Sequence, residues 1–298
     1  MTGADAYSIS RIRRSIKAFA IGKVASATAT FALLFALAAI MTQLEYASYI
    51  GATAVVDLGL SVGSLGLQWV ANTTVPRIRV GGTVTQLKRA ILALAAVQSL
   101  PYMLIGLVVY MVAPTISGLL GGVSGAEAIA MYGIVLAVEG LSRLFREQML
   151  ALLLLQGITQ LVQLLRMLVV LAAVWAVHAG GTDVTAVHVA QAEIFASAST
   201  GLIAAAVLWA QLAKLPSTPG ERADLSEWIN VRESAKLAIN AHGSFLLLMA
   251  FSTEVITTLV ARLLGAEATA LFGFASRLLN QVRKYLPSGF WPASSARP

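Results

Sequence analysis

Long apolar stretches separated by short polar breaks recur along the whole chain. A bilayer core of about 30 Å is crossed by about 20 apolar residues in a helix, and most of these stretches reach that length. A spanning segment must satisfy its own backbone hydrogen bonds, so the pattern predicts helices rather than open strands. We therefore expect an all-α, polytopic membrane helix bundle with eight spans, at residues 18–42, 50–71, 90–112, 126–142, 149–177, 187–212, 235–262 and 266–286.

Composition supports a membrane location. Hydrophobic residues make up 58% of the 298 positions and charged residues only 12%, which is too little charge to coat a soluble globule of this length. The net charge of +7 comes from small basic clusters between apolar stretches, which argues against nucleic acid as a partner. The chain has no cysteine and no phosphate loop, paired-histidine metal spacing or serine elbow, so we expect no cofactor and no soluble-enzyme chemistry.

The basic clusters predict the topology. Lys and Arg favour cytoplasmic loops, and here they alternate between the ends of successive predicted helices. The segments around Glu45, around residues 114–125 and around Asp183 carry no Lys or Arg and are predicted to face outward. We expect both termini in the cytoplasm, together with the clusters Arg11, Arg13, Arg14 and Lys17; Arg77, Arg79, Lys88 and Arg89; Arg143 and Arg146; and Lys214, Arg222, Arg232 and Lys236.

The longest polar connection divides the chain unequally. We expect a first six-helix lobe at residues 1–214, a cytoplasmic linker at 215–233, and the first two helices of an incomplete second lobe at 234–298. A short self-similarity, EYASYIG at Glu45–Gly51 and EATALFG at Glu267–Gly273, agrees with a six-helix repeat. A full second copy would extend far beyond residue 298, so we expect a C-terminally truncated chain.

Polar residues recur at helical spacing on the second predicted helix. A central Asp or Arg costs about 2.5 to 3.5 kcal/mol on insertion scales, so polar positions at membrane depth carry information. The spacing predicts one continuous helix face that is turned away from lipid, formed by Asp57, Ser61, Ser64, Gln68 and Asn72.

The fifth predicted helix carries a stronger polar face, with Arg166 near the middle of the membrane. Small polar residues in such faces commonly form interhelical hydrogen bonds, whereas ionisable residues more often mark a pathway or cavity. The face comprises Gln156, Thr159, Gln160, Gln163 and Arg166. Shorter stripes lie on the sixth helix, with Glu193, Ser197 and Thr200, and on the seventh, with Asn240, Ser244, Glu254 and Thr258.

Two further groups of charged residues have simpler explanations from sequence. Glu193 is expected at a solvated helix end. Glu139, Arg143 and Glu147 follow i, i+4 spacing and predict a salt-bridged ladder that extends towards the cytoplasmic surface rather than a functional site.

Four segments together resemble the polysaccharide flippases of the multidrug/oligosaccharidyl-lipid/polysaccharide exporter superfamily: LEYASYIGATAVVDLGLSVG, PRIRVGGTVTQLKRAI, EGLSRLFREQMLALLLLQGITQLVQLLRM and LLGAEATALFGFASRLLNQVRK. The resemblance implies two six-helix lobes around a central cavity in the bacterial inner membrane. It also implies outward movement of undecaprenyl-pyrophosphate-linked oligosaccharide by alternating access, for cell-surface polysaccharide biosynthesis. This chain departs from the family by ending about two helices into the second lobe.

On this hypothesis the polar face of the fifth helix binds the anionic substrate through Arg166, Gln163, Gln160 and Gln156, and Asp57 and Glu254 are the candidates for coupling to H⁺ or Na⁺. Membrane lipids and a polysaccharide polymerase are the further candidate partners. Three alternatives stay open: a multidrug exporter of the same superfamily, a membrane enzyme of polysaccharide assembly, and an inactive fragment. The short predicted outward loops argue against the enzyme.

Overall fold

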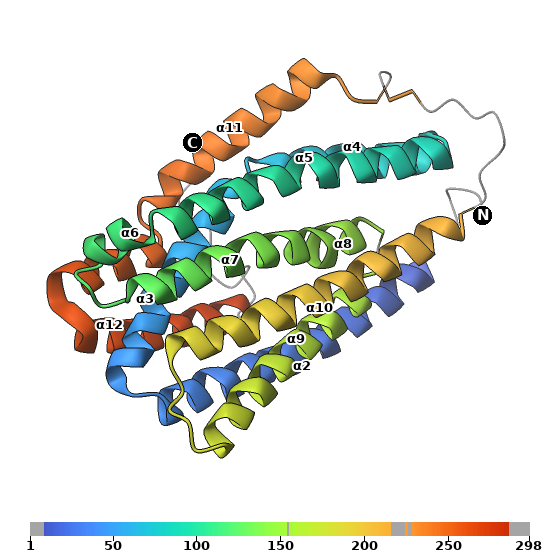
Figure 1. Ribbon diagram of the computed structural model, residues 1–298. Coiled ribbons are helices and arrows are strands. Elements are labelled where there is room, and N and C mark those ends of the chain that lie inside the picture. Colours follow the sequence, from blue (N-terminus) through green and yellow to red (C-terminus); the bar gives the residue numbers. More distant parts are fainter. Residues whose placement is uncertain (1–8, 154, 216–223, 226–227, 286–298) are drawn as a thin grey trace, which may run out of the picture.

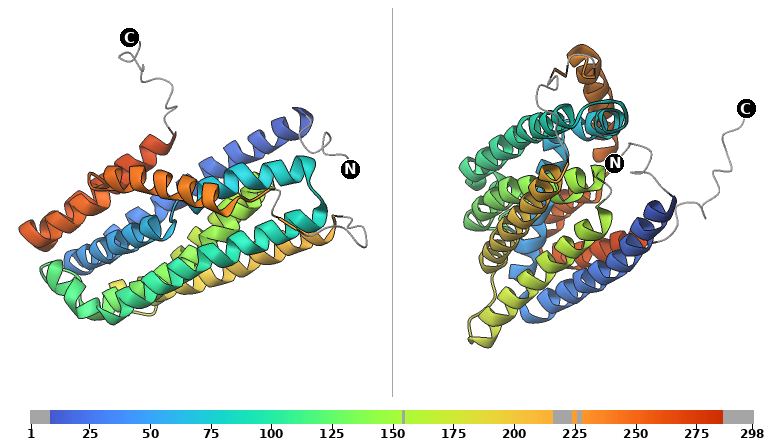
Figure 2. Two further views of the ribbon diagram at one scale, coloured as in Figure 1. Left: turned by 90° about the horizontal axis from the view of Figure 1, so that it is seen from above. Right: turned by 90° about the vertical axis from the view of Figure 1, so that its right-hand side faces the viewer.

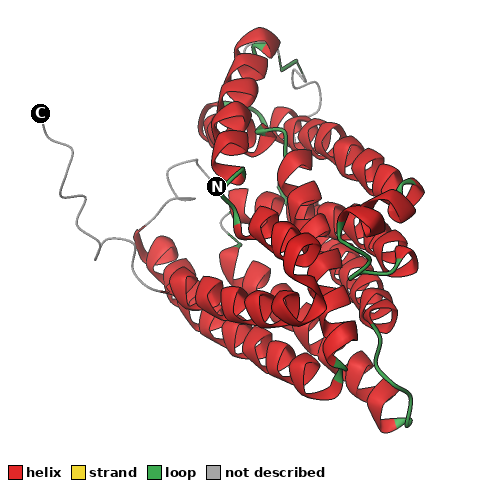
Figure 3. Ribbon diagram, turned by 90° about the vertical axis from the view of Figure 1, so that its left-hand side faces the viewer, coloured by secondary structure: helices red, strands yellow, loops and turns green. Residues whose placement is uncertain are grey.

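In the computed structural model, the described residues are 9–153, 155–215, 224–225 and 228–285. They form helices and connecting loops, without a strand (Figure 3), which confirms the predicted all-α class. The elements are α2 (Ile9–Ile40), α3 (Gln43–Gly63), α4 (Leu67–Gly81), α5 (Val84–Met111), α6 (Ala113–Leu119), α7 (Ala126–Arg143), the π-helix η1 (Leu144–Met149), α8 (Leu150–Leu152), α9 (Gln156–Ala179), α10 (Ala186–Ala213), α11 (Val231–Met249) and α12 (Thr253–Tyr285).

Six helices of the described chain are long and apolar enough to cross a membrane, or seven if the bent pair of α3 and α4 is one span. The last of the six covers Val231–Val282 and is 52 residues long, far more than the roughly 20 that one crossing needs. It is interrupted between α11 and α12 and again at Gly265, whose φ of 80° and ψ of −167° are not helical. The predicted division of this stretch into two crossings, and the total of eight, stay predictions.

The helices lie roughly along one direction, with α2, α9 and α10 side by side and α5 against α7 (Figure 1). The connections α2–α3, α6–α7 and α9–α10 lie towards one end of the bundle, and the connections α4–α5 and α8–α9 lie towards the other. Figure 2 shows α11 at one edge, where it contacts α4, whereas α12 packs along α3. The loops that were predicted to lie on opposite sides of the membrane therefore lie at opposite ends of the bundle. Which of these two ends is cytoplasmic stays a prediction.

The second predicted helix is broken. Backbone φ is positive at Leu65 (45°) and Gly66 (68°), so the α-helical hydrogen bonds cannot continue, and α3 and α4 are bent by 50°. Gly66 also has no space for a Cβ, because the backbone of Ala238 on α11 lies against it. The predicted continuous helix over 50–71, with one polar face from Asp57 to Asn72, is wrong: the break divides that face.

The predicted fourth loop is also wrong. Arg143 ends α7 and Arg146 lies in η1, within an unbroken helical run from Ala126 to Leu152. Arg146 is 0% exposed, so this basic pair is not a surface loop. A buried carboxylate, Glu139, pairs with both arginines and compensates the fully buried charge of Arg146.

The two segments of the suspected repeat contact each other. Gly273 on α12 faces Ile50 on α3, whose side chain fills the space that a Cβ at Gly273 would need. Arg277, one turn beyond Gly273, bonds to α3 as well. Glu45–Gly51 and Glu267–Gly273, far apart in sequence, therefore belong to neighbouring helices at one interface.

Close packing of α5 on α7 depends on two glycines. A Cβ at Gly133 would lie 2.7 Å from the backbone nitrogen of Tyr110 and 2.9 Å from the carbonyl oxygen of Gly106. Backbone cannot move aside as a side-chain tip can, so Gly133→Ala is expected to lower the free energy of unfolding by about 1–3 kcal/mol. Detergent-denaturation curves check this, with Gly118→Ala as the control because nothing lies within 4 Å of that position. Equal losses for both variants would contradict the packing argument.

Candidate functional site

A cavity of about 270 Å³ lies inside the bundle. Residues of α2, α3, α7, α9, α10 and α12 surround it, so it lies between the helices of the predicted first lobe and α12. Its lining holds three arginines and four carboxylates: Arg143, Arg166, Arg277, Asp57, Glu139, Glu193 and Glu254. Ionisable residues gathered between long apolar helices are costly unless they are paired or solvated, which makes the cavity the candidate functional site.

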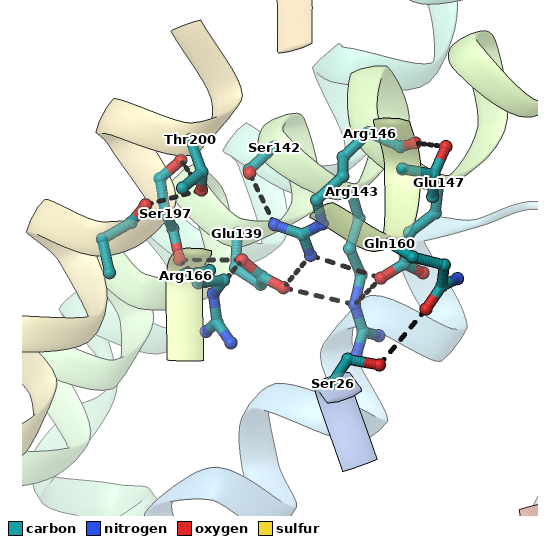
Figure 4. Close-up of polar contacts among 12 residues, drawn as sticks. Ser26, Glu139, Ser142, Arg143, Arg146, Glu147, Gln160, Arg166, Ser197 and Thr200 are labelled. Atoms are coloured by element: carbon teal, nitrogen blue, oxygen red, sulfur yellow. Dashed lines mark hydrogen bonds and ion pairs between the residues drawn. The ribbon is translucent and has the colours of Figure 1, made fainter. Parts of the chain in front are cut away.

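Glu139 is the centre of a buried ion-pair network (Figure 4). Its Oε1 lies 3.3 Å from Nε of Arg143 and 2.9 Å from Nη2 of Arg146, and its Oε2 lies 3.0 Å from Nε of Arg166. The hydroxyl of Ser197 on α10 donates a hydrogen bond of 2.7 Å to the same Oε2. One carboxylate, with a side chain only 5% exposed, therefore fixes three guanidinium groups from α7, η1 and α9.

Arg166 is held from one side only. Its Nε contacts Glu139 and donates to Ser197 over 3.0 Å. Among the described residues, Nη1 and Nη2 of Arg166 have no hydrogen-bond partner, and the side chain lines the cavity. The guanidinium is thus positioned in advance and keeps its two terminal nitrogens available for an acceptor in the cavity.

Arg143 and Arg146 differ in their exposure to the cavity. The side chain of Arg143 is 44% exposed and lines the cavity, and its Nε lies 3.8 Å from Glu147 in addition to its contact with Glu139. Arg146 is fully buried and donates to Ser142 over 3.0 Å and to Glu147 over 3.2 Å, without reaching the cavity. Arg146 therefore supports the network, whereas Arg143 and Arg166 can meet a ligand.

Arg277 brings α12 into the site. Its Nη1 donates to the hydroxyl of Tyr49 over 2.9 Å and its Nη2 donates to Thr53, both on α3. The guanidinium carbon also lies 4.9 Å from the centre of the Tyr49 ring, which adds a cation–π contact. The two acceptors on α3 are neutral hydroxyls, whereas the carboxylates of Asp57 on the same helix and Glu193 on α10 interact with the positive charge of Arg277 across the cavity.

The structure brings together four of the six residues that the sequence selected. Arg166, Gln163, Asp57 and Glu254 line the same cavity although they come from three different helices. Gln160 lies outside it and accepts a hydrogen bond of 3.2 Å from Ser26, which joins α9 to α2. Gln156 begins α9 and also lies outside the cavity lining.

For two other residues of the site, Glu139 and Glu193, the structure differs from the prediction made from the sequence. The ion pairs of the Glu139, Arg143 and Glu147 ladder are confirmed, but Glu139 is buried rather than extended to the surface. Glu193 is 8% exposed and lines the cavity, so the expected solvated helix end is wrong. The i+4 and i+7 spacing from Glu139 to Arg143 and Arg146 was a local signal for the network, whereas its pairing with Arg166 depends on how the helices pack.

No family model matches the chain, and no curated protein and no solved structure matches it either.

Proposed function

We propose that this protein is a transporter that moves undecaprenyl-pyrophosphate-linked oligosaccharide across the bacterial inner membrane by alternating access. The observation that carries the proposal is the available terminal nitrogens of Arg166 beside a cavity within the membrane bundle. A guanidinium fork binds phosphate oxygens through charge-assisted hydrogen bonds. Arg143, at the same cavity, supplies a second donor for a diphosphate.

The position of the cavity supports alternating access. Helices of the proposed first lobe form most of its lining, and α12, from the proposed second lobe, closes it through Arg277. The contact between the two repeat segments on α3 and α12 is what a pair of related lobes would produce at their interface. On this proposal the fold is that of the polysaccharide flippases, with eight crossings and both termini in the cytoplasm.

The proposal is tested by expressing the gene in a bacterial strain that lacks its own polysaccharide flippase. Because the protein would supply the missing translocation step, surface polysaccharide is expected to return, with immunoblots of extracted polysaccharide as the measurement. Absence of polysaccharide from cells that contain the folded protein in their inner membrane would count against the proposal.

Asp57 and Glu254 are the proposed coupling residues for H⁺ or Na⁺. Both line the cavity of Arg166, so binding of a cation there would act on the same space as the anionic substrate. In proteoliposomes, Asp57→Asn and Glu254→Gln are expected to remove the acceleration of transport by an imposed proton or sodium gradient while substrate binding persists. Glu127→Gln is a matched control, because Glu127 lies in the first turn of α7 and does not line the cavity. Unchanged gradient dependence in both cavity variants would exclude this role.

A multidrug exporter of the same superfamily is the second candidate, and the four carboxylates of the cavity favour it. Cationic drugs would pair with Asp57, Glu193 or Glu254 rather than with Arg166. Drug-susceptibility assays on the same strain separate the two candidates, because only the exporter is expected to raise resistance to cationic drugs.

A further inference from the structure

A second cavity, of about 250 Å³, adjoins the first. It lies where α3 breaks into α4 and is lined further by α5, the end of α7, the π-helix η1 and α11. The two cavities share Leu60 and Arg143 in their linings, so a ligand bound at the arginines of the first has the second as its neighbour. Arg143 and Glu147 are the arginine and the carboxylate of this lining, and its other polar residues are serine, glutamine, histidine, tyrosine and tryptophan.

Two glutamines in this lining are nine-tenths buried and incompletely bonded. Gln98 is 3% exposed; its Nε2 lies 3.5 Å from the hydroxyl of Tyr102, and its Oε1 has no partner within the described chain. Gln148 is 8% exposed, and its Nε2 is likewise without a partner among the described residues. Buried polar groups are normally bonded, so two residues of one cavity lining that leave an acceptor and a donor unsatisfied favour a ligand that can both donate and accept.

The rest of the lining narrows the chemistry of that ligand. Ser61, Ser64 and Gln68 add further neutral donors and acceptors, and His242 contributes a ring nitrogen, Nδ1, that is also unpaired within the described residues. Tyr102, Trp69 and Phe245 provide aromatic surface. A sugar ring has hydroxyls that donate and accept together with an apolar face that packs on aromatic rings, whereas a fully ionised phosphate group has only acceptors and cannot donate to Gln98.

We propose that the second cavity binds the sugar that is attached directly to the pyrophosphate, while Arg143 and Arg166 hold the pyrophosphate in the first. This inference rests on the proposed function and deepens it, because the sugar and the charged pyrophosphate are bound in two different cavities. Gln98 and Gln148 are the residues that bond the sugar hydroxyls. Arg143, shared by both cavities, lies at the junction of phosphate and sugar.

The test compares two lipids on the full chain in nanodiscs: undecaprenyl pyrophosphate and the same lipid carrying one N-acetylglucosamine. The wild-type protein is expected to bind the glycosylated lipid about 10-fold more tightly, a ratio that one or two well-formed hydrogen bonds supply. Gln98→Leu combined with Gln148→Leu is expected to abolish this preference and leave the affinity for undecaprenyl pyrophosphate within about 2-fold of wild type. Gln191→Leu is the matched control, because Gln191 is exposed on α10 and lines neither cavity.

The outcomes separate the inference from the proposed function. If the wild type binds both lipids equally, or if the double variant retains the preference, the sugar site is wrong while pyrophosphate binding stands. If the wild type binds neither lipid, the proposed function fails and the sugar site with it. Size-exclusion profiles report folding, and if the double variant does not fold, the single variants Q98L and Q148L are expected each to reduce the preference.

Discussion

Glu139→Ala is expected to lower the free energy of unfolding by about 3–5 kcal/mol, the range observed when one partner of a buried ion pair is removed. Glu139 contacts Arg143, Arg146 and Arg166, and its loss would leave the fully buried Arg146 with Glu147 as its remaining carboxylate. Ser197 would also lose the acceptor for its hydroxyl. Equilibrium unfolding of the purified protein in mixed detergent micelles measures the effect.

Glu147→Ala provides the matched control for this prediction. Glu147 pairs with Arg143 at 3.8 Å and Arg146 at 3.2 Å, two of the same arginines, but its side chain is 47% exposed, against 5% for Glu139. Solvated ion pairs contribute little, so the loss is expected to stay within about 1 kcal/mol. Equal destabilisation by the two variants would show that Glu139 is not the centre of the network.

Arg166→Ala is expected to reduce transport by about 10- to 100-fold, because it removes hydrogen bonds to a charged substrate that are typically worth about 1.5–3 kcal/mol. The fold should persist, since Glu139 keeps Arg143 and Arg146 as partners. The measurement is the rate at which lipid-linked oligosaccharide reaches the outer leaflet, normalised to the amount of folded protein.

Arg166→Lys is the control that separates charge from shape. A lysine retains the positive charge but not the planar fork that satisfies Glu139 and a phosphate at the same time, so transport is expected to lie between those of wild type and Arg166→Ala. Normal transport by Arg166→Ala, in folded protein, would remove Arg166 from the substrate site.

The sequence was sufficient to predict the helical class because the periodic apolar stretches determine it. It also placed Arg166, Gln163, Asp57 and Glu254 on inward faces, and these residues do share a cavity. It missed the break at Leu65 and Gly66, because a positive φ at Leu65 has no signal in the apolar pattern and Gly66 is one of 24 glycines.

The role of Glu139 could not be predicted for a different reason. Spacing along one helix shows its pairs with Arg143 and Arg146, but its contact with Arg166 joins α7 to α9 and depends on helix packing. The same holds for Arg277, whose partners Tyr49 and Thr53 lie on α3, more than two hundred positions earlier in the chain. In the sequence, such arginines look like the basic residues that mark a cytoplasmic loop. Only the packing of the helices distinguishes the two cases.

The most direct test of the account is translocation by the purified protein in proteoliposomes. Undecaprenyl-pyrophosphate-linked oligosaccharide is placed in both leaflets, and an added enzyme modifies the sugars that it can reach outside. The account predicts that wild-type protein makes the inner pool accessible and that Arg166→Ala slows this by about 10-fold or more. An inner pool that stays protected in liposomes containing folded wild-type protein would contradict it.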